Sequence, residues 1–176
     1  RSHSTLSPSG ASRWMECTPS AVFESKFDYK QSNYADEGTF AHFVSELMLK
    51  NHFQKISKAI YNDELKKAKK HVFYNTELYN HCLDYVNLVI GYYENISEAQ
   101  KHIALELKLD LGEYIPNGIG HLDVAIYSDN LLHIIDLKYG KGILVEAERN
   151  KQLMIYALGA LKLAELHSQI DTIVCT

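Results

Sequence analysis

Apolar residues repeat with two different periods along this chain, and the period changes near residue 102. Over residues 36–52, and again after Asn75 or Thr76, they recur every three or four positions, as in helices with one buried face. From His102 the period is two, which predicts a strand. One alternating set is apolar and the other is mixed: Ile103, Leu105, Leu107 and Leu109 against Ala104, Glu106 and Lys108. The pattern therefore predicts helices first and a sheet afterwards.

Two further helices are expected before that strand. Ser7 is a suitable N-cap and Pro8 a suitable first position for a short helix that leads to Cys17. The basic run at residues 64–71, ELKKAKKH, is expected within another helix. The simplest interpretation of this run is a solvated helix face, and contact with phosphates is the alternative.

The second half of the chain has the pattern of strands joined by turns. Residues 111–120 contain Pro, Asn and Gly and are expected to connect two strands. In the next strand Leu122, Val124 and Ile126 are expected to share a face, with Asp123 and Ala125 on the other. The remaining expected elements are a strand over residues 131–139, a long helix over residues 146–167 and a strand over residues 171–175. The expected fold class is α/β, with a mixed central β-sheet flanked by helices and a helical N-terminal part.

Length and composition favour a single domain. The chain has 176 residues, of which 46% are hydrophobic, which is enough for a substantial core. Residues 1–6 are expected to be a cloning remnant and tail, and residues 7–176 a single domain. Because the last predicted strand runs to the final residues, the natural protein is expected to continue beyond Thr176.

Charge and cysteine content narrow the classes of partner. No run approaches the roughly 18 apolar residues of a membrane span, and no signal-peptide pattern opens the chain, so no membrane partner is expected. Three widely spaced cysteines suit reduced thiols in the cytoplasm. The formal net charge of −4 provides no general attraction for a polyanion, so any binding of nucleic acid must be local or assisted by metal.

Three charged residues interrupt the apolar strands: Asp123, Asp136 and Lys138. Adjacent strands lie roughly 4.8 Å apart, so a suitable register brings the two aspartates close together. A divalent cation such as Mg²⁺ or Mn²⁺ removes their repulsion and accepts a backbone carbonyl, such as that of Leu137, as a further ligand. Lys138 is expected on the same strand face as Asp136, where it can act on a water or a phosphate. The alternative is a set of solvent-facing aspartates and a weak surface ion pair.

Four short motifs occur together along the chain: GTFAH, GHLD, DLK and QLMIY. In this order they resemble the RecB-like branch of the PD-(D/E)XK nuclease superfamily, close to a set of phage and prophage exonuclease-like proteins. The resemblance covers nearly the whole chain and implies a restriction-endonuclease-like fold.

The resemblance also implies roles for residues in these motifs. Asp123, Asp136, the Leu137 carbonyl and His42 would hold one or two Mg²⁺ or Mn²⁺ ions, and Lys138 would help to activate water. Glu46 would be a second metal ligand or would orient Lys138. Gln152 and Tyr156 would contact DNA or order the site, although Tyr156 packing on the sheet is the alternative. Glu106, on the mixed face of the first strand, is a further candidate.

Some RecB-like nucleases hold an iron–sulfur cluster with one early and three late cysteines. Here Cys17 has the early place, but only Cys175 follows Tyr156. A set of four thiolate ligands therefore cannot be assembled within this chain, and no iron–sulfur cluster is expected.

The expected function is a metal-dependent deoxyribonuclease that hydrolyses phosphodiester bonds. Within the family we favour an exonuclease of phage recombination or replication. It is expected in the cytoplasm of a bacterial host, with the proteins of those processes as partners. A structure- or sequence-selective endonuclease, or a DNA-binding module without activity, are the alternatives. The sequence leaves open strand polarity, single- or double-stranded substrate, DNA or RNA, and oligomeric state.

Overall fold

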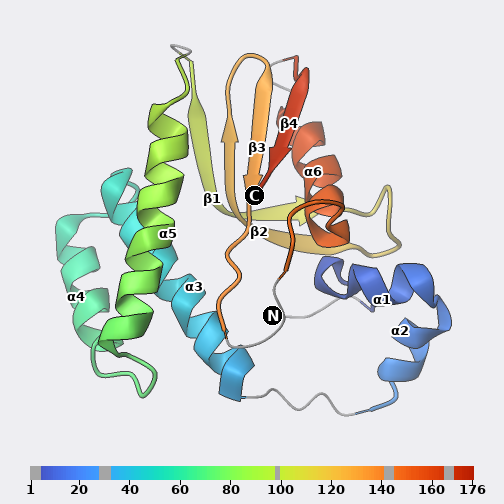
Figure 1. Ribbon diagram of the computed structural model, residues 1–176, viewed down its shortest axis with the longest axis horizontal. Helices are drawn as coiled ribbons and strands as arrows, with labels where there is room; N and C mark the ends of the chain where they lie inside the picture. The colour runs from blue at the N-terminus through green and yellow to red at the C-terminus, as the bar shows by residue number, and fades with distance from the viewer. Residues whose placement is uncertain (1–4, 28–32, 98–99, 141–144, 165–168) are drawn as a thin grey trace. The chain divides into compact units, whose positions relative to one another are not determined.

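The computed structural model describes residues 5–27, 33–97, 100–140, 145–164 and 169–176. The chain divides into two compact units. Figure 1 shows their helices and strands, coloured by residue number. The sheet unit comprises Arg1–Lys30, Glu98–Asp136 and Leu144–Thr176, and the helical unit comprises Gln31–Ser97 and Leu137–Ile143. None of the helices in the described ranges is both long and apolar enough to cross a membrane.

The sheet unit contains a four-stranded mixed sheet in the order β1-β2-β3-β4. Its strands are β1 (His102–Asp110), β2 (Ile119–Tyr127), β3 (Leu131–Ile135) and β4 (Thr172–Cys175). The first three strands are antiparallel and β4 is parallel to β3. The α/β class and the mixed sheet are therefore confirmed, and each predicted strand is present, although β3 ends four residues earlier than expected.

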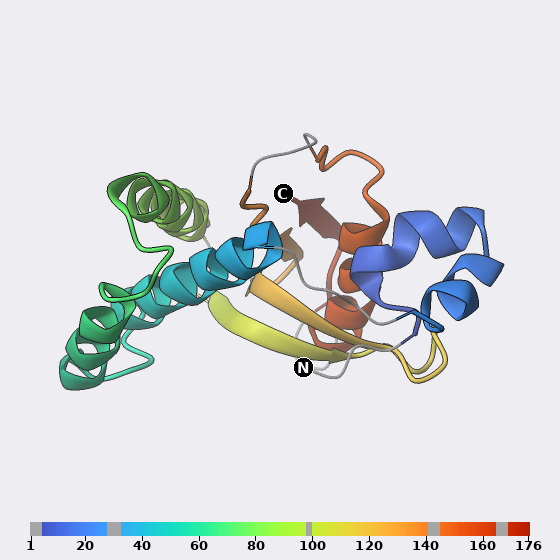
Figure 2. The ribbon, with the colours of Figure 1, turned by 90° about the horizontal axis from the view of Figure 1, so that it is seen from below.

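Helix α6 (Lys151–Ala164) packs on one face of this sheet, as the ribbon in Figure 2 shows. The predicted helix began at residue 146, but α6 begins only after Asn150, whose side-chain oxygen accepts a hydrogen bond of 3.1 Å from the Leu153 N–H. The remaining expected helical residues, 165–167, lie outside the described ranges.

The N-terminal part of the sheet unit is helical, as predicted. Ser7 caps a 3₁₀ turn, η1 (Pro8–Gly10), which leads into α1 (Ala11–Glu16). The indole N–H of Trp14 donates to the Ser7 carbonyl over 2.8 Å, and both η1 and α1 pack against α6. A further helix, α2 (Pro19–Glu24), was not predicted.

The helical unit consists of three helices and a short later segment of chain. Helix α3 (Asn33–His52) packs against α4 (Lys58–Ala68) and α5 (Thr76–Glu94). Ser57 caps α4 and Asn75 caps α5 through side-chain oxygens. Helix α4 ends at Ala68, so the last part of the predicted basic helix is a loop.

The face that β1 and β2 present to α6 changes part-way along both strands. The apolar cluster under α6 contains Ala104 and Leu107 from β1, and Ala125 and Leu122 from β2. Residues three apart lie on opposite faces of a regular strand, so each strand must switch phase between them. The predicted single face from Ile103 to Leu109 is therefore wrong, and so is the face shared by Leu122 and Val124.

In β1 the switch coincides with the backbone of Glu106, which has a φ of 50°. This left-handed conformation is unfavourable for a residue with a β-carbon and is unusual inside a strand. Pairing keeps the same register on both sides, with Leu105 opposite Val124 and Leu107 opposite Leu122. The intervening position places Glu106 opposite Asp123.

The β1–β2 connection is tightly packed around Gly118. A β-carbon at this glycine would lie 2.8 Å from both the carbonyl oxygen and the β-carbon of Ile115 and 3.0 Å from the β-carbon of Leu111. Both neighbours are buried. Gly91 in α5, by contrast, has no described atom within 4 Å of an added β-carbon.

We therefore expect the same substitution to have opposite effects at the two glycines. Gly118→Ala should lower the free energy of unfolding by about 1–3 kcal/mol, because buried backbone and side chains must move. Gly91→Ala should raise it by about 0.5–1 kcal/mol through helix propensity. Urea unfolding measures both, and equal effects of the two variants would contradict the packing described around Gly118.

Candidate metal centre

Two carboxylates from adjacent strands meet at the point where the sheet switches phase. Glu106 on β1 and Asp123 on β2 occupy opposite positions in the register, and a carboxylate oxygen of each lies within 4.8 Å of the other. Both residues are half-buried. Like charges this close destabilise each other unless a cation or a proton intervenes.

Asp136 continues the row of acids at the end of β3. The β2–β3 register pairs Val124 with Ile135, so the next position along places Asp136 across from Asp123. Its backbone N–H donates to the Thr176 carbonyl over 3.1 Å, which extends the β3–β4 ladder by one step. The predicted register of Asp123 and Asp136 thus agrees with the strand pairing. On β1, Glu106 occupies the position opposite Asp123.

Tyr156 and Gln152 reach the aspartates from α6. The Gln152 amide nitrogen donates to the Tyr156 hydroxyl over 3.1 Å. Burial raises the pKa of the Tyr156 hydroxyl, and the negative charges of Asp136 and Asp123 raise it further, against the hydrogen bond from Gln152, to about 12. The hydroxyl therefore remains protonated near neutral pH and lies within electrostatic reach of both aspartates.

Gly120 explains how Tyr156 comes so close to β2. A β-carbon at Gly120 would lie 2.9 Å from a ring carbon of Tyr156, so only glycine leaves room for the ring. Gly120 is also the first residue of the GHLD motif, three positions before Asp123. Tyr156 packs on the sheet, as one of the two predicted alternatives has it, and its role toward DNA or in ordering the site stays a prediction.

The other predicted site residues, His42, Glu46, Leu137 and Lys138, belong to the helical unit. His42 and Glu46 both lie on α3, and Glu46 forms an ion pair with Lys50 one turn further along. A β-carbon at Gly38 would lie 3.4 Å from the Tyr139 carbonyl oxygen, so α3 lies beside the segment that carries Leu137 and Lys138. Their part in a shared metal site stays a prediction.

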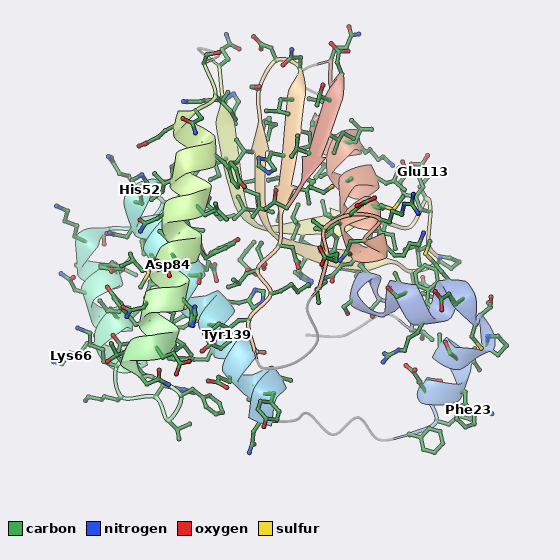
Figure 3. The ribbon with its side chains drawn as sticks, in the orientation of Figure 1. Phe23, His52, Lys66, Asp84, Glu113 and Tyr139 are labelled. Atoms are coloured by element: carbon green, nitrogen blue, oxygen red, sulfur yellow. The ribbon has the colours of Figure 1, made fainter. Side chains whose placement is uncertain are left out.

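The expected position of Lys138 on a strand is wrong. Strand β3 ends at Ile135, so the two-residue spacing from Asp136 no longer places both side chains on one face. Lys138 instead lines a pocket of about 470 Å³ within the helical unit, together with Glu37, Glu77 and His81. Tyr139, labelled in Figure 3, also lines it; burial raises the pKa of its hydroxyl, and the Glu37 carboxylate raises it further.

The donor set of the sheet unit suits a hard divalent cation. Carboxylate oxygens are the ligands that Mg²⁺ and Mn²⁺ prefer, and two of them converge at Glu106 and Asp123. Asp136 follows Ile135, the partner of Val124, so the register extended by one residue places it across from Asp123.

Comparison with protein families covers almost the whole chain. Residues 3–176 match the model described as "Protein of unknown function (DUF2800)". The chain belongs to the DUF2800 family. No solved structure matches this DUF2800 chain.

The backbone conformation of Glu106 in this DUF2800 chain was not predicted from the sequence. Simple alternation assigned it to the mixed face of β1 beside Ala104 and Lys108, and nothing in the local residue types signals a left-handed backbone there. The sequence indicated only that Glu106 is a carboxylate in an apolar strand, as many residues before the β1–β2 connection as Asp123 is after it. A register count across the hairpin would have paired the two.

Two substitutions at Glu106 separate the effect of its charge from the effect of its backbone conformation. Glu106→Gln and Glu106→Gly both remove the carboxylate, but only glycine adopts a φ of 50° without a steric penalty. Without metal, Glu106→Gly should be more stable than Glu106→Gln by about 1 kcal/mol. Both variants should bind Mn²⁺ more weakly than the parent.

Denaturant unfolding in EDTA and calorimetric titration with Mn²⁺ measure the two effects. A less stable glycine variant would mean that Glu106 is not strained, and parental Mn²⁺ affinity in the glutamine variant would remove it from the candidate site.

Proposed function

We propose that this protein is a metal-dependent nuclease that hydrolyses phosphodiester bonds of DNA. The observation that supports it best is the half-buried pair of Glu106 and Asp123, held opposite each other at a strained backbone position. Unfavourable backbone conformations persist where the surrounding structure enforces them, and they cluster at functional sites. A purely structural sheet would have no need of two facing carboxylates.

The fold proposed for this activity is restriction-endonuclease-like, of the RecB-like PD-(D/E)XK branch. The mixed sheet with a helix on one face is compatible with this fold. The motifs lie on the elements that the resemblance implies: GTFAH on a helix before the sheet, GHLD on β2 and QLMIY on α6. DLK follows the end of β3 directly.

The cation would be held by the carboxylates of Glu106, Asp123 and Asp136. The Leu137 carbonyl, next to Asp136 in the chain, and the His42 imidazole are the further ligands that we propose. One or two Mg²⁺ or Mn²⁺ ions would, when bound, act as Lewis acids toward the phosphate and lower the pKa of water. No iron–sulfur cluster is part of this proposal.

The remaining residues would position substrate and water. The Tyr156 hydroxyl stays protonated and can donate a hydrogen bond to a phosphate oxygen, and Gln152 fixes its position. Lys138 would offset charge that develops on the phosphate. Glu46, on α3, would be a second metal ligand or would orient Lys138. These groups bind and orient the substrate, so a strong protein base is not required.

Within this function we favour an exonuclease of phage recombination or replication, acting in the cytoplasm of a bacterial host with the proteins of those processes. An endonuclease would use the same carboxylates. A DNA-binding module that lost its activity would tolerate loss of the acids, and the strained Glu106 argues against it.

Metal dependence is the first test of this function. Mn²⁺ should raise the free energy of unfolding by about 2.7 kcal/mol at a hundredfold excess over Kd, because only the folded chain brings the carboxylates together. Asp123→Asn should lose most of this stabilisation, and Asp129→Asn, an exposed turn residue, should keep it. Thermal unfolding with and without Mn²⁺ measures the effect, and equal responses of the two variants would contradict the metal site.

Cleavage of end-labelled linear and closed circular DNA, with Mn²⁺ or EDTA, distinguishes the modes of action. An exonuclease should degrade only the linear DNA, an endonuclease should cut both, and EDTA should abolish either activity. A preparation that binds Mn²⁺ but cuts neither DNA would overturn the proposed function.

Lys138 provides a separate test of catalysis. Removing one well-placed electrostatic group typically reduces the rate by about 10²–10³. Lys138→Ala should therefore cut DNA far more slowly while binding Mn²⁺ normally, whereas Lys108→Ala, an exposed lysine on β1, should cut at the parental rate. If Lys138→Ala retains the parental rate, the lysine belongs only to the pocket that it lines with Glu37.

A further inference from the structure

An open groove runs along the helical unit, apart from the proposed metal centre. It has a volume of about 680 Å³, within the range of ligand sites. Its lining comes from one side of α3, the end of α4 and the loop that follows α4. The lining residues are Asp36, Thr39, Phe40, Phe43, Lys67, Ala68, His71, Val72 and Phe73.

Flat rings form much of this surface. His71 stacks on Phe40, with ring centroids 4.1 Å apart and planes inclined by 12°, and Phe73 lies 5.5 Å from His71. Phe43 is 38% exposed and Val72 is 85% exposed. A solvated lysine face accounts for the basic run but gives no reason for rings and a valine to remain open to water.

Positive charge is concentrated in the chain segment that supplies Lys67, Ala68 and His71 to the lining. Residues 58–71 contain five lysines and two acids, in a chain whose formal net charge is −4. Lys67 is neutralised by Asp63 and Glu64, at 2.8 and 2.7 Å. Three further lysines are exposed and form no ion pair within the described residues: Lys66, Lys69 and Lys70. Figure 3 labels Lys66.

We propose that this groove binds a short single-stranded segment of nucleic acid. Exposed rings give the bases a stacking surface, and the lysines give the phosphates counter-charges; proteins that bind single strands combine these two features. Phosphates would lie near Lys69 and Lys70, which stand between the lining residues Ala68 and His71 in the chain, and away from the Asp36 carboxylate. This inference deepens the proposed function, on which it rests for nucleic acid as the partner.

Matched substitutions test the charge contribution. Fluorescence anisotropy with a labelled ten-nucleotide oligo(dT), in EDTA so that nothing is cut, gives the affinity of the whole chain. Lys70→Glu should weaken binding about tenfold and reduce its dependence on salt by about one charge. Lys58→Glu changes the charge equally at the other end of α4 and should bind like the parent. Asp36→Asn should bind more tightly.

The ring contribution has its own control. Phe43→Ala should weaken binding about fivefold or more, through lost stacking. Leu83→Ala removes an equally exposed apolar side chain from α5, outside the groove, and should have no effect. An oligo(rU) and a blunt duplex of equal length show whether the groove distinguishes RNA and whether it needs a single strand.

The outcomes separate this inference from the nuclease proposal. Weaker binding by Lys70→Glu and Phe43→Ala, with normal Mn²⁺ stabilisation, supports the groove even if no DNA is cut. Parental affinity in Lys70→Glu and Phe43→Ala overturns the groove proposal even if the protein is a nuclease. The same holds if the controls Lys58→Glu and Leu83→Ala lose as much affinity as these two variants. Sedimentation of Val72→Asp adds a check: a parental dimer that this variant dissociates would show that a second copy covers the groove.

Discussion

Two facing carboxylates at a strained point of a sheet set the main physical constraint on this molecule. A left-handed backbone at Glu106 costs about 1–2 kcal/mol, at the position where the Asp123 carboxylate lies within 4.8 Å. The fold offsets this cost through the apolar cluster beneath α6, against which Ala104 and Leu107 both pack across the phase switch. The switch changes which residues face α6 and leaves the two acids opposite each other at the transition.

The surroundings of the pair hold it in place. Gly120 admits the Tyr156 ring, and the Tyr156 hydroxyl accepts a hydrogen bond from Gln152 within reach of Asp123 and Asp136. The N–H of Asp136 bonds to the carbonyl of Thr176, so β4 helps to place the third acid. Residues from three strands and one helix thus converge on one row of the sheet. Positioning by regular elements, rather than by loops, suits a site that must hold a cation in fixed geometry.

Much of the fold could be predicted from periodicity and caps. Ser7, Asn75 and the change of period at His102 correctly located a turn, a helix start and the first strand. The faces of β1 and β2 could not be predicted, because alternation assumes extended backbone at every residue and Glu106 departs from it. The end of β3 was missed for a related reason: Asp136 still pairs with β4, but the chain then leaves the sheet, which carries Lys138 into the helical unit.

The candidate site was partly accessible to sequence reasoning. Asp123 and Asp136 stand out as acids in apolar strands, and the register supports their pairing. Glu106 needed the register of the hairpin, and the groove beside α4 needed tertiary structure, since Phe43 and Phe73 are 30 residues apart in the chain. Side chains that meet only through folding leave no local pattern.

A crystal of the protein grown with Mn²⁺ and measured at the manganese absorption edge would show directly whether Glu106 and Asp123 hold the cation. We expect an anomalous peak about 2.0–2.2 Å from carboxylate oxygens of both residues. A peak bound elsewhere, or ordered Glu106 and Asp123 side chains turned apart with no peak between them at saturating Mn²⁺, would contradict it.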